Sequence, residues 1–170
     1  KLIRTAIERA NSVIYDKSIS AAEYNGMGTT CVVATIIEDY LYVANVGDSR
    51  LYLVDRGISQ ITRDHSLVEE MVRSGEIDRS QAREHPDKNI ITRAVGAAST
   101  VKIDFFDLKL KEHDKVLMCS DGLYGELEDE QIAQMASRAT TMHTLAKDLV
   151  DAANKNGGSD NISVVCIRIQ

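Results

Sequence analysis

Between Thr29 and Ile61 the sequence consists mainly of β-branched and aromatic residues, interrupted by short polar turns. Residues of these types favour the pleated backbone of a strand. The pattern predicts four strands that follow one another as an antiparallel meander, so the fold of this chain must contain a sheet. The four runs are Thr29–Ile37, Tyr40–Val46, Leu51–Val54 and Ile58–Ile61.

Helical periodicity lies on either side of this region. From Leu2 to Ile14 the apolar residues recur at helical spacing, which predicts an amphipathic helix with one face on a core. Similar stretches begin at Asp129 and Met142. Because strands and helices cluster apart along the chain, the predicted class is α+β with a mainly antiparallel sheet. Further strands are predicted at Val101–Leu110, Val116–Cys119 and Ile162–Ile169.

A polar segment from Thr62 to Arg93 separates two of the predicted strands. Ser66 with Glu69, and Asp78 with Gln81, have the spacing of capping boxes, in which side chains satisfy the free N–H groups at a helix start. The segment is therefore predicted to be an insertion that holds two short helices.

Length and charge limit the functional classes. A chain of 170 residues can bury one core, so we expect a single domain over residues 1–170, and a monomer. The net charge of −6 is spread along the chain, which leaves no basic face for nucleic acid or for a membrane surface.

Because Lys1 is neither an initiator Met nor the start of a signal peptide, we expect the chain to begin in mid-protein. The widely spaced Cys31, Cys119 and Cys166 indicate buried free thiols and a cytoplasmic location.

Three aspartates, Asp48, Asp121 and Asp160, lie close to glycine where a predicted strand meets a turn. Each one alone is an ordinary turn residue. Together they are more informative, because clustered carboxylates repel one another unless a cation such as Mg²⁺ or Mn²⁺ lies between them. No serine or cysteine stands in a nucleophile motif, and His113 and His143 are interpreted as surface residues.

Five short motifs occur in the order of the successive motifs of type 2C protein phosphatases, and the sequence closely resembles that family from Gly26 to its C-terminus. The compact spacing is similar to that of the bacterial stand-alone members. The motifs are Gly26-Met27-Gly28-Thr29-Thr30, Ala44-Asn45-Val46-Gly47-Asp48-Ser49-Arg50, Thr62-Arg63-Asp64-His65-Ser66, Ser120-Asp121-Gly122-Leu123 and Asp160-Asn161-Ile162-Ser163-Val164-Val165.

This resemblance implies two antiparallel sheets packed face to face and flanked by helices, an α-β-β-α sandwich. It also implies two core ions of Mn²⁺ or Mg²⁺ and an additional third ion. Asp121 and Asp160 match ligands of one core ion, whereas Asp48 matches a ligand of the additional ion, to which Asp121 can also contribute. Asn161 is expected to brace the site from outside the ligand shell.

The resemblance implies hydrolysis of phosphoserine and phosphothreonine in proteins by water activated at the metal ions, so no residue of this chain is expected to act as nucleophile. The expected partners are phosphorylated proteins of a bacterial serine/threonine kinase signalling system. Residues 62–93 resemble the flap beside the family's active site. Arg63, His65 and His85 lie in this flap and are interpreted as structural or surface residues.

Two upstream motifs of the family, of the Arg-x-x-Asn-x-Asp and Asp-Gly-x-Gly-Gly-His types, do not occur in these residues. In the family they supply the phosphate-binding Arg, the Asp that bridges the core metals, a carbonyl ligand and the His proposed as general acid. We therefore expect the fold to be N-terminally incomplete and the 170-residue chain to be inactive on its own.

Two alternatives stay open. The first is a catalytically silent member of the same fold that acts by binding or regulation, because the absent bridging Asp would by itself silence the site. The second is a serine phosphatase of the bacterial sporulation-regulator branch, which is less favoured because those relatives usually lack the flap.

Overall fold

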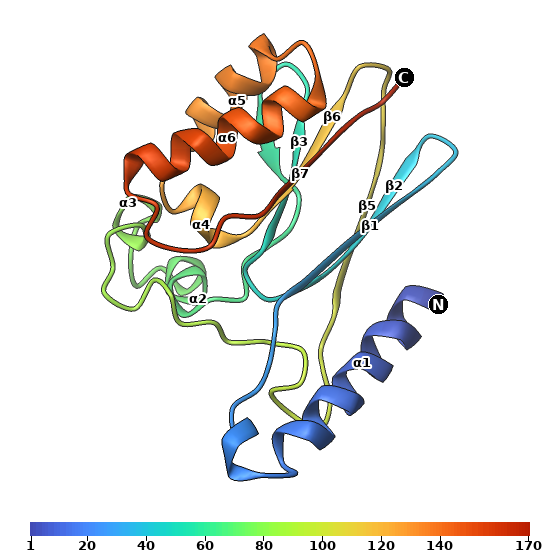
Figure 1. Cartoon of the computed structure of the whole chain (residues 1–170), viewed down its shortest axis with the longest axis vertical. Coiled ribbons are helices and arrows are strands. Elements are labelled where there is room, and N and C mark those ends of the chain that lie inside the picture. Colours follow the sequence, from blue (N-terminus) through green and yellow to red (C-terminus); the bar gives the residue numbers. More distant parts are fainter. The chain divides into compact units, whose positions relative to one another are not determined.

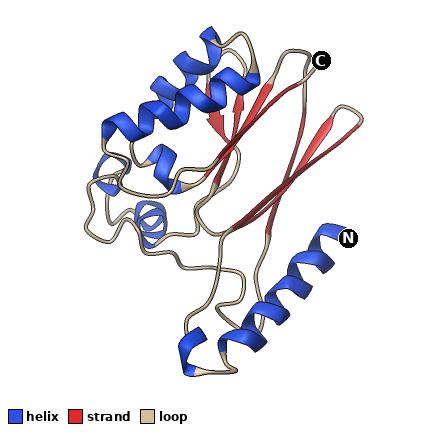
Figure 2. Ribbon diagram, viewed as in Figure 1, coloured by secondary structure: helices blue, strands red, loops and turns tan.

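A computed structural model describes all 170 residues of the chain, which form two compact units. Residues 1–35, 42–48 and 64–106 form the first unit, and residues 36–41, 49–63 and 107–170 form the second. Two antiparallel sheets with their helices confirm the predicted α+β class (Figures 1 and 2). The single domain stays a prediction. None of the helices is long and apolar enough to cross a bilayer.

Helix α1 (Leu2–Ser18) confirms the predicted opening helix and belongs to the first unit. Its apolar side packs on the end of β2 and on residues 95–103, because Ile7 shares a buried cluster with side chains from both. A three-stranded sheet has the order β1-β2-β5, with β2 in the centre, which explains why Val43 to Val46 are fully buried. Its strands are β1 (Cys31–Ile37), β2 (Tyr40–Val46) and β5 (Asp104–Lys109).

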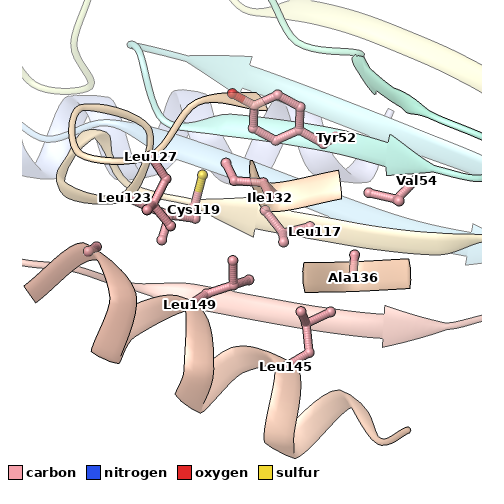
Figure 3. Close-up of a cluster of buried hydrophobic side chains, with 11 residues drawn as sticks. Tyr52, Val54, Leu117, Cys119, Leu123, Leu127, Ile132, Ala136, Leu145 and Leu149 are labelled. Atoms are coloured by element: carbon pink, nitrogen blue, oxygen red, sulfur yellow. The ribbon is translucent and has the colours of Figure 1, made fainter. Parts of the chain in front are cut away.

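The second sheet belongs to the second unit and has the order β4-β3-β6-β7, with every neighbouring pair antiparallel. Its strands are β3 (Arg50–Val54), β4 (Ile58–Gln60), β6 (Lys115–Cys119) and β7 (Val164–Arg168). Helices α5 (Asp129–Arg138) and α6 (Met142–Asn156) lie together on one side of it (Figure 1). Between helices and sheet lies an apolar core that includes Leu117, Ile132 and Leu149 (Figure 3). This core holds β6, which ends just before Asp121, and β7, which begins just after the loop that carries Asp160.

The predicted meander is wrong at one point, because β2 and β3 lie in different sheets. The chain leaves the first sheet at Gly47, whose φ of +103° lies outside the range of a strand. The N–H and the C=O of Gly47 both bond to His65, so neither takes part in a strand ladder. Residue types show which segments are extended, but they do not show which strand each one pairs with.

The two helices predicted in the 62–93 segment are confirmed. Helix α2 (Leu67–Ser74) starts where Ser66 Oγ accepts the N–H of Glu69 at 3.3 Å, and it ends at Gly75 with φ of +79°. Helix α3 (Arg79–Ala82) starts with the complete capping box of Asp78 and Gln81. The carboxylate of Glu69 pairs with Arg79 and so ties α2 to the start of α3. Two short elements were not predicted, the 3-10 helix η1 (Ala22–Tyr24) and helix α4 (Asp121–Tyr124).

Candidate metal centre

Asp121 lies in the second unit, where β6 ends and α4 begins. The N–H of Gly122 donates to Asp121 Oδ1 at 3.0 Å, which orients the carboxylate against the first turn of α4. The strand that leads to it is anchored by buried Leu117 and Cys119. A rigid core strand therefore presents this carboxylate at its end.

Asp160 lies in the loop between α6 and β7, also in the second unit. Helix α6 ends at Gly157, and Gly158 turns the chain with φ of +58°. The N–H of Asn161 donates to Asp160 Oδ1 at 2.6 Å, so this carboxylate is oriented in the same way as Asp121. The side chain of Asp160 is exposed.

Direct hydrogen bonds join these two loops. The N–H of Ser120 donates to the Ser163 carbonyl at 3.1 Å, and the N–H of Ser163 donates to Ser120 Oγ at 3.0 Å. Ser120 Oγ also donates to the Asn161 carbonyl at 3.1 Å. A Cβ on Gly122 would lie 2.4 Å from that carbonyl oxygen, so only glycine permits the approach. The structure thus brings together the loops that carry two of the three predicted ligands, and the separation of their carboxylates stays a prediction.

The donor set of these loops fits a hard divalent cation. Asp121 and Asp160 each use Oδ1 as a hydrogen-bond acceptor, and no Lys, Arg or His side chain forms an ion pair with either. Two unneutralised carboxylates on adjoining loops repel each other, and an ion that prefers oxygen ligands removes this repulsion. Nowhere in this structure do three or more His, Cys, Asp or Glu side chains come together as an ion site.

Asp48, the third predicted ligand, belongs to the first unit and follows directly on β2. Its residue is only 7% exposed, which is unusual for a carboxylate. The turn that carries it depends on Gly47, because a Cβ there would lie 2.5 Å from Thr30 Cγ2. Asn45 Nδ2 also donates to the Gly47 carbonyl at 3.2 Å. The backbone that precedes Asp48 in the sequence is therefore held in one conformation.

The structure shows a polar cluster around the buried His65 in the first unit that the sequence analysis did not recognise. His65, with a side chain 3% exposed, accepts the Gly47 N–H on Nδ1 at 3.0 Å. Its Nε2 lies 3.2 Å from Asp104 Oδ2, and Arg93 Nη1 donates to Asp104 Oδ1 at 2.9 Å. The motif Thr62–Ser66 was a signal for this residue, but its partners lie far away in the sequence.

The hydrogen bonds of His65 define its protonation. Because Nδ1 accepts a hydrogen bond, the neutral ring carries its proton on Nε2 and donates it to Asp104. Burial lowers the pKa of His65, the hydrogen bond to Asp104 opposes this effect, and the charge of Arg93 adds to it. Burial would raise the pKa of Asp104, but the hydrogen bonds from His65 and Arg93 outweigh it and lower that pKa.

The lowered pKa of His65 predicts a pH dependence of stability. As the pH falls below about 6.5, the unfolded chain takes up a proton on His65 before the folded chain does, which favours unfolding. The stabilisation is present above that pH and is lost as the pH falls through the lower folded pKa. In thermal melts of the intact protein in EDTA, the melting temperature of the parent should fall more steeply between about pH 7.5 and 5.5 than that of His65→Gln. Equal slopes would show that the buried ring is not held neutral.

The cysteines and the remaining histidines lie apart from these loops or are held in unreactive surroundings. All three cysteines are free; Cys119 is buried, while Cys31 and Cys166 are half-buried. Burial raises the pKa of Cys31 and raises that of Cys166 to about 11, so both thiols stay protonated at neutral pH. His113 and His143 are exposed, in agreement with their interpretation as surface residues.

These features define a two-sheet α+β protein with a candidate site for oxygen-ligated cations. The family model for protein phosphatase 2C matches residues 1–79. The serine/threonine phosphatase stp of Listeria monocytogenes is 38% identical over 166 residues, which are 97% of this chain and 66% of that protein. The solved structure of serine/threonine phosphatase Stp1 from Staphylococcus aureus is 37% identical, with a TM-score of 0.96 and coverage of 99% of this chain and 67% of that chain. The chain belongs to the protein phosphatase 2C family, which confirms the resemblance seen in the sequence.

A further relative has been solved with metal ions bound. The solved catalytic domain of the serine threonine protein phosphatase PstP, in complex with two manganese ions, is 29% identical with a TM-score of 0.87. It matches 98% of this chain and 70% of its own length. The chain itself spans 66% of the length of the Listeria phosphatase. The activity of the whole protein is therefore a proposal.

Proposed function

We propose that the intact protein, meaning this chain extended to the length of its longer relatives, is a metal-dependent serine/threonine protein phosphatase. The observation that carries the proposal is the set of hydrogen bonds that joins the Asp121 loop to the Asp160 loop. Each loop carries an aspartate that forms no ion pair with a cationic side chain. Relatives named serine/threonine phosphatases support the reaction class.

In this proposal Asp121 and Asp160 hold one core ion, and Asp48 holds the additional ion. When bound, the ions supply positive charge for the phosphoryl oxygens and lower the pKa of a water molecule at the site. The chain's own groups orient the ligands, since the N–H groups of Gly122 and Asn161 fix Oδ1 of the two core carboxylates. The Oδ2 atom of each carboxylate is then available to the ion.

The proposed substrates are proteins that carry phosphoserine or phosphothreonine. The 62–93 segment, with α2 and α3, is proposed to act as a flap that contacts the phosphopeptide. The opposing serine/threonine kinase, the cytoplasmic location and the monomeric state stay predictions.

The test is hydrolysis of a phosphothreonine peptide by the intact protein, with a phosphotyrosine peptide of the same sequence as control. Turnover should require Mn²⁺ or Mg²⁺, stop in EDTA and return when the metal is added back. Metal-independent turnover, or turnover of the phosphotyrosine peptide alone, would contradict the proposal. Metal binding without turnover of either peptide would favour the catalytically silent alternative.

A companion prediction concerns the 170-residue chain alone. It should bind Mn²⁺ weakly and show little or no hydrolysis of the same phosphothreonine peptide. The reason is that two-metal catalysis needs both ions a few ångströms apart, and this chain gives a core ion only two of the expected carboxylates. Isothermal titration with Mn²⁺ measures the binding, and a phosphate-release assay measures the hydrolysis. Robust turnover by the chain alone would refute the ligand assignment.

A further inference from the structure

The turn that precedes Asp48 is bound by His65 at two points. The N–H of Gly47 donates to His65 Nδ1 at 3.0 Å, and the N–H of His65 donates back to the Gly47 carbonyl at 3.0 Å. His65 therefore binds Gly47 through both its ring and its backbone. These two groups belong to the two peptide units on either side of the Gly47 Cα, so both units have little freedom to rotate, and Asp48 is the next residue along the chain.

The ring of His65 is itself fixed from the opposite side. Nε2 donates to Asp104 Oδ2 at 3.2 Å, and Arg93 Nη1, 3.1 Å from the same ring nitrogen, donates to the other oxygen of that carboxylate. The two donors thus converge on Asp104. The His65 carbonyl also accepts the N–H of Thr92 at 2.8 Å, so the residue is held by β5 and by the end of the 62–93 segment.

This arrangement exceeds what the packing of a buried histidine requires. A buried imidazole needs one partner for each ring nitrogen, and a water or any nearby carbonyl would serve Nε2. Here the carboxylate of Asp104, which is paired with Arg93, orients the His65 ring. The ring in turn binds Gly47, the residue that precedes the candidate metal ligand in the sequence. Carboxylate–histidine pairs of this kind fix the orientation of the group they support.

We infer that His65, oriented by Asp104 and Arg93, is a positioning residue that fixes the Gly47–Asp48 turn and thereby strengthens the binding of a divalent cation by Asp48. The inference rests on the proposed function, in which Asp48 is a ligand of the additional ion. His65 does not touch the ion in this account; it acts through its two hydrogen bonds with Gly47.

Two substitutions test the roles of the two ring nitrogens of His65 one at a time. In His65→Asn, the side-chain oxygen lies close to the position of Nδ1 and can still accept the Gly47 N–H, but nothing reaches Asp104. In His65→Gln, the longer amide reaches the position of Nε2 and can still donate to Asp104, but no acceptor remains for Gly47. The inference requires that the loss of the Gly47 bond weaken Mn²⁺ binding more than the loss of the Asp104 bond does.

The experiment titrates the intact proteins with Mn²⁺ alone and measures free Mn²⁺ by electron paramagnetic resonance. His65→Gln should weaken the weakest Mn²⁺ site about tenfold and leave the tighter sites unchanged, whereas His65→Asn, which keeps the Gly47 bond and loses only the orienting carboxylate, should weaken that site about threefold or less. The Mn²⁺ concentration for half-maximal activity should rise for His65→Gln by the same factor, with kcat retained at saturating Mn²⁺. Unchanged Mn²⁺ affinity in His65→Gln, or an equal loss in both variants, would overturn the inference.

A double-mutant cycle with Asp48→Asn shows whether the effect passes through Asp48. In the Asp48→Asn background, His65→Gln should have no further effect on Mn²⁺ binding, because the ligand it positions is already lost. A full tenfold effect in that background would overturn the inference. If Asp48→Asn weakens Mn²⁺ binding but His65→Gln does not, only the inference fails. If Asp48→Asn itself leaves Mn²⁺ binding unchanged, the assignment of Asp48 in the proposed function fails as well.

Thermal melting in EDTA controls for folding in each variant. If His65→Gln does not fold, Asp104→Asn takes its place, since it keeps the size of the side chain but removes the charge that orients the ring. Asp104→Asn should weaken the same Mn²⁺ site, and Mn²⁺ binding equal to that of the parent would overturn the inference.

Discussion

Replacing Asp121 with Asn in the intact protein is expected to abolish turnover of a phosphopeptide, whereas Asp48→Asn should leave part of it. Asp121 is the proposed ligand of a core ion, and a neutral amide binds a divalent cation far more weakly than a carboxylate. Asp48 is the proposed ligand of the additional ion alone, so its replacement should weaken catalysis without removing the core ions. Turnover is measured in saturating Mn²⁺.

The substitution keeps the fold, because the amide oxygen of an Asn can still accept the N–H of Gly122. Asp148→Asn serves as the control, since this aspartate is exposed on α6 and its neutralisation should change neither turnover nor melting. Equal activity of Asp121→Asn and its parent would show that Asp121 is not a core ligand. Equal loss in the two variants Asp121→Asn and Asp48→Asn would remove the distinction between core and additional ion.

Gly122→Ala is expected to disturb both stability and metal binding. The new Cβ would lie 2.4 Å from the carbonyl oxygen of Asn161 and 3.0 Å from its carbonyl carbon, so backbone must move. Forcing an extra carbon into a packed site typically costs about 1–3 kcal/mol. The movement separates the loops that carry Asp121 and Asp160, so Mn²⁺ affinity should fall about tenfold or more, as when the support of a ligand is lost.

Gly57→Ala is the matched control, because the space around Gly57 is open and no atom would lie within 4 Å of its Cβ. Thermal melting in EDTA measures the stability of both variants, and Mn²⁺ titration measures binding. A Gly122→Ala protein that melts and binds Mn²⁺ like Gly57→Ala would mean that the two loops need not lie against each other.

Local patterns in the sequence predicted most of the individual elements. The helical spacing from Leu2 onward and the capping residues Ser66 and Asp78 fix helices through neighbours within a few positions, so the sequence alone shows them. The strand runs were recognisable for the same reason. The glycines beside Asp48 and Asp121 were also informative, since each permits a close approach that no other residue allows.

Features that depend on distant residues were not predictable in this way. The change of sheet at Gly47 depends on His65, which is 18 positions away, and the orientation of His65 depends on Asp104, another 39 positions away. In the sequence His65 is a polar residue in a loosely helical segment, and a structural or surface position was the reasonable interpretation. Only the fold shows that its ring lies between an ion pair and the turn of a candidate ligand.

The most direct test of the account is a crystal structure of the intact protein grown with Mn²⁺, with data collected at the manganese absorption edge. We predict an anomalous peak that lies about 2.0–2.6 Å from a carboxylate oxygen of both Asp121 and Asp160. Carboxylates more than about 8 Å apart, with no manganese peak between them, would contradict the proposed metal centre.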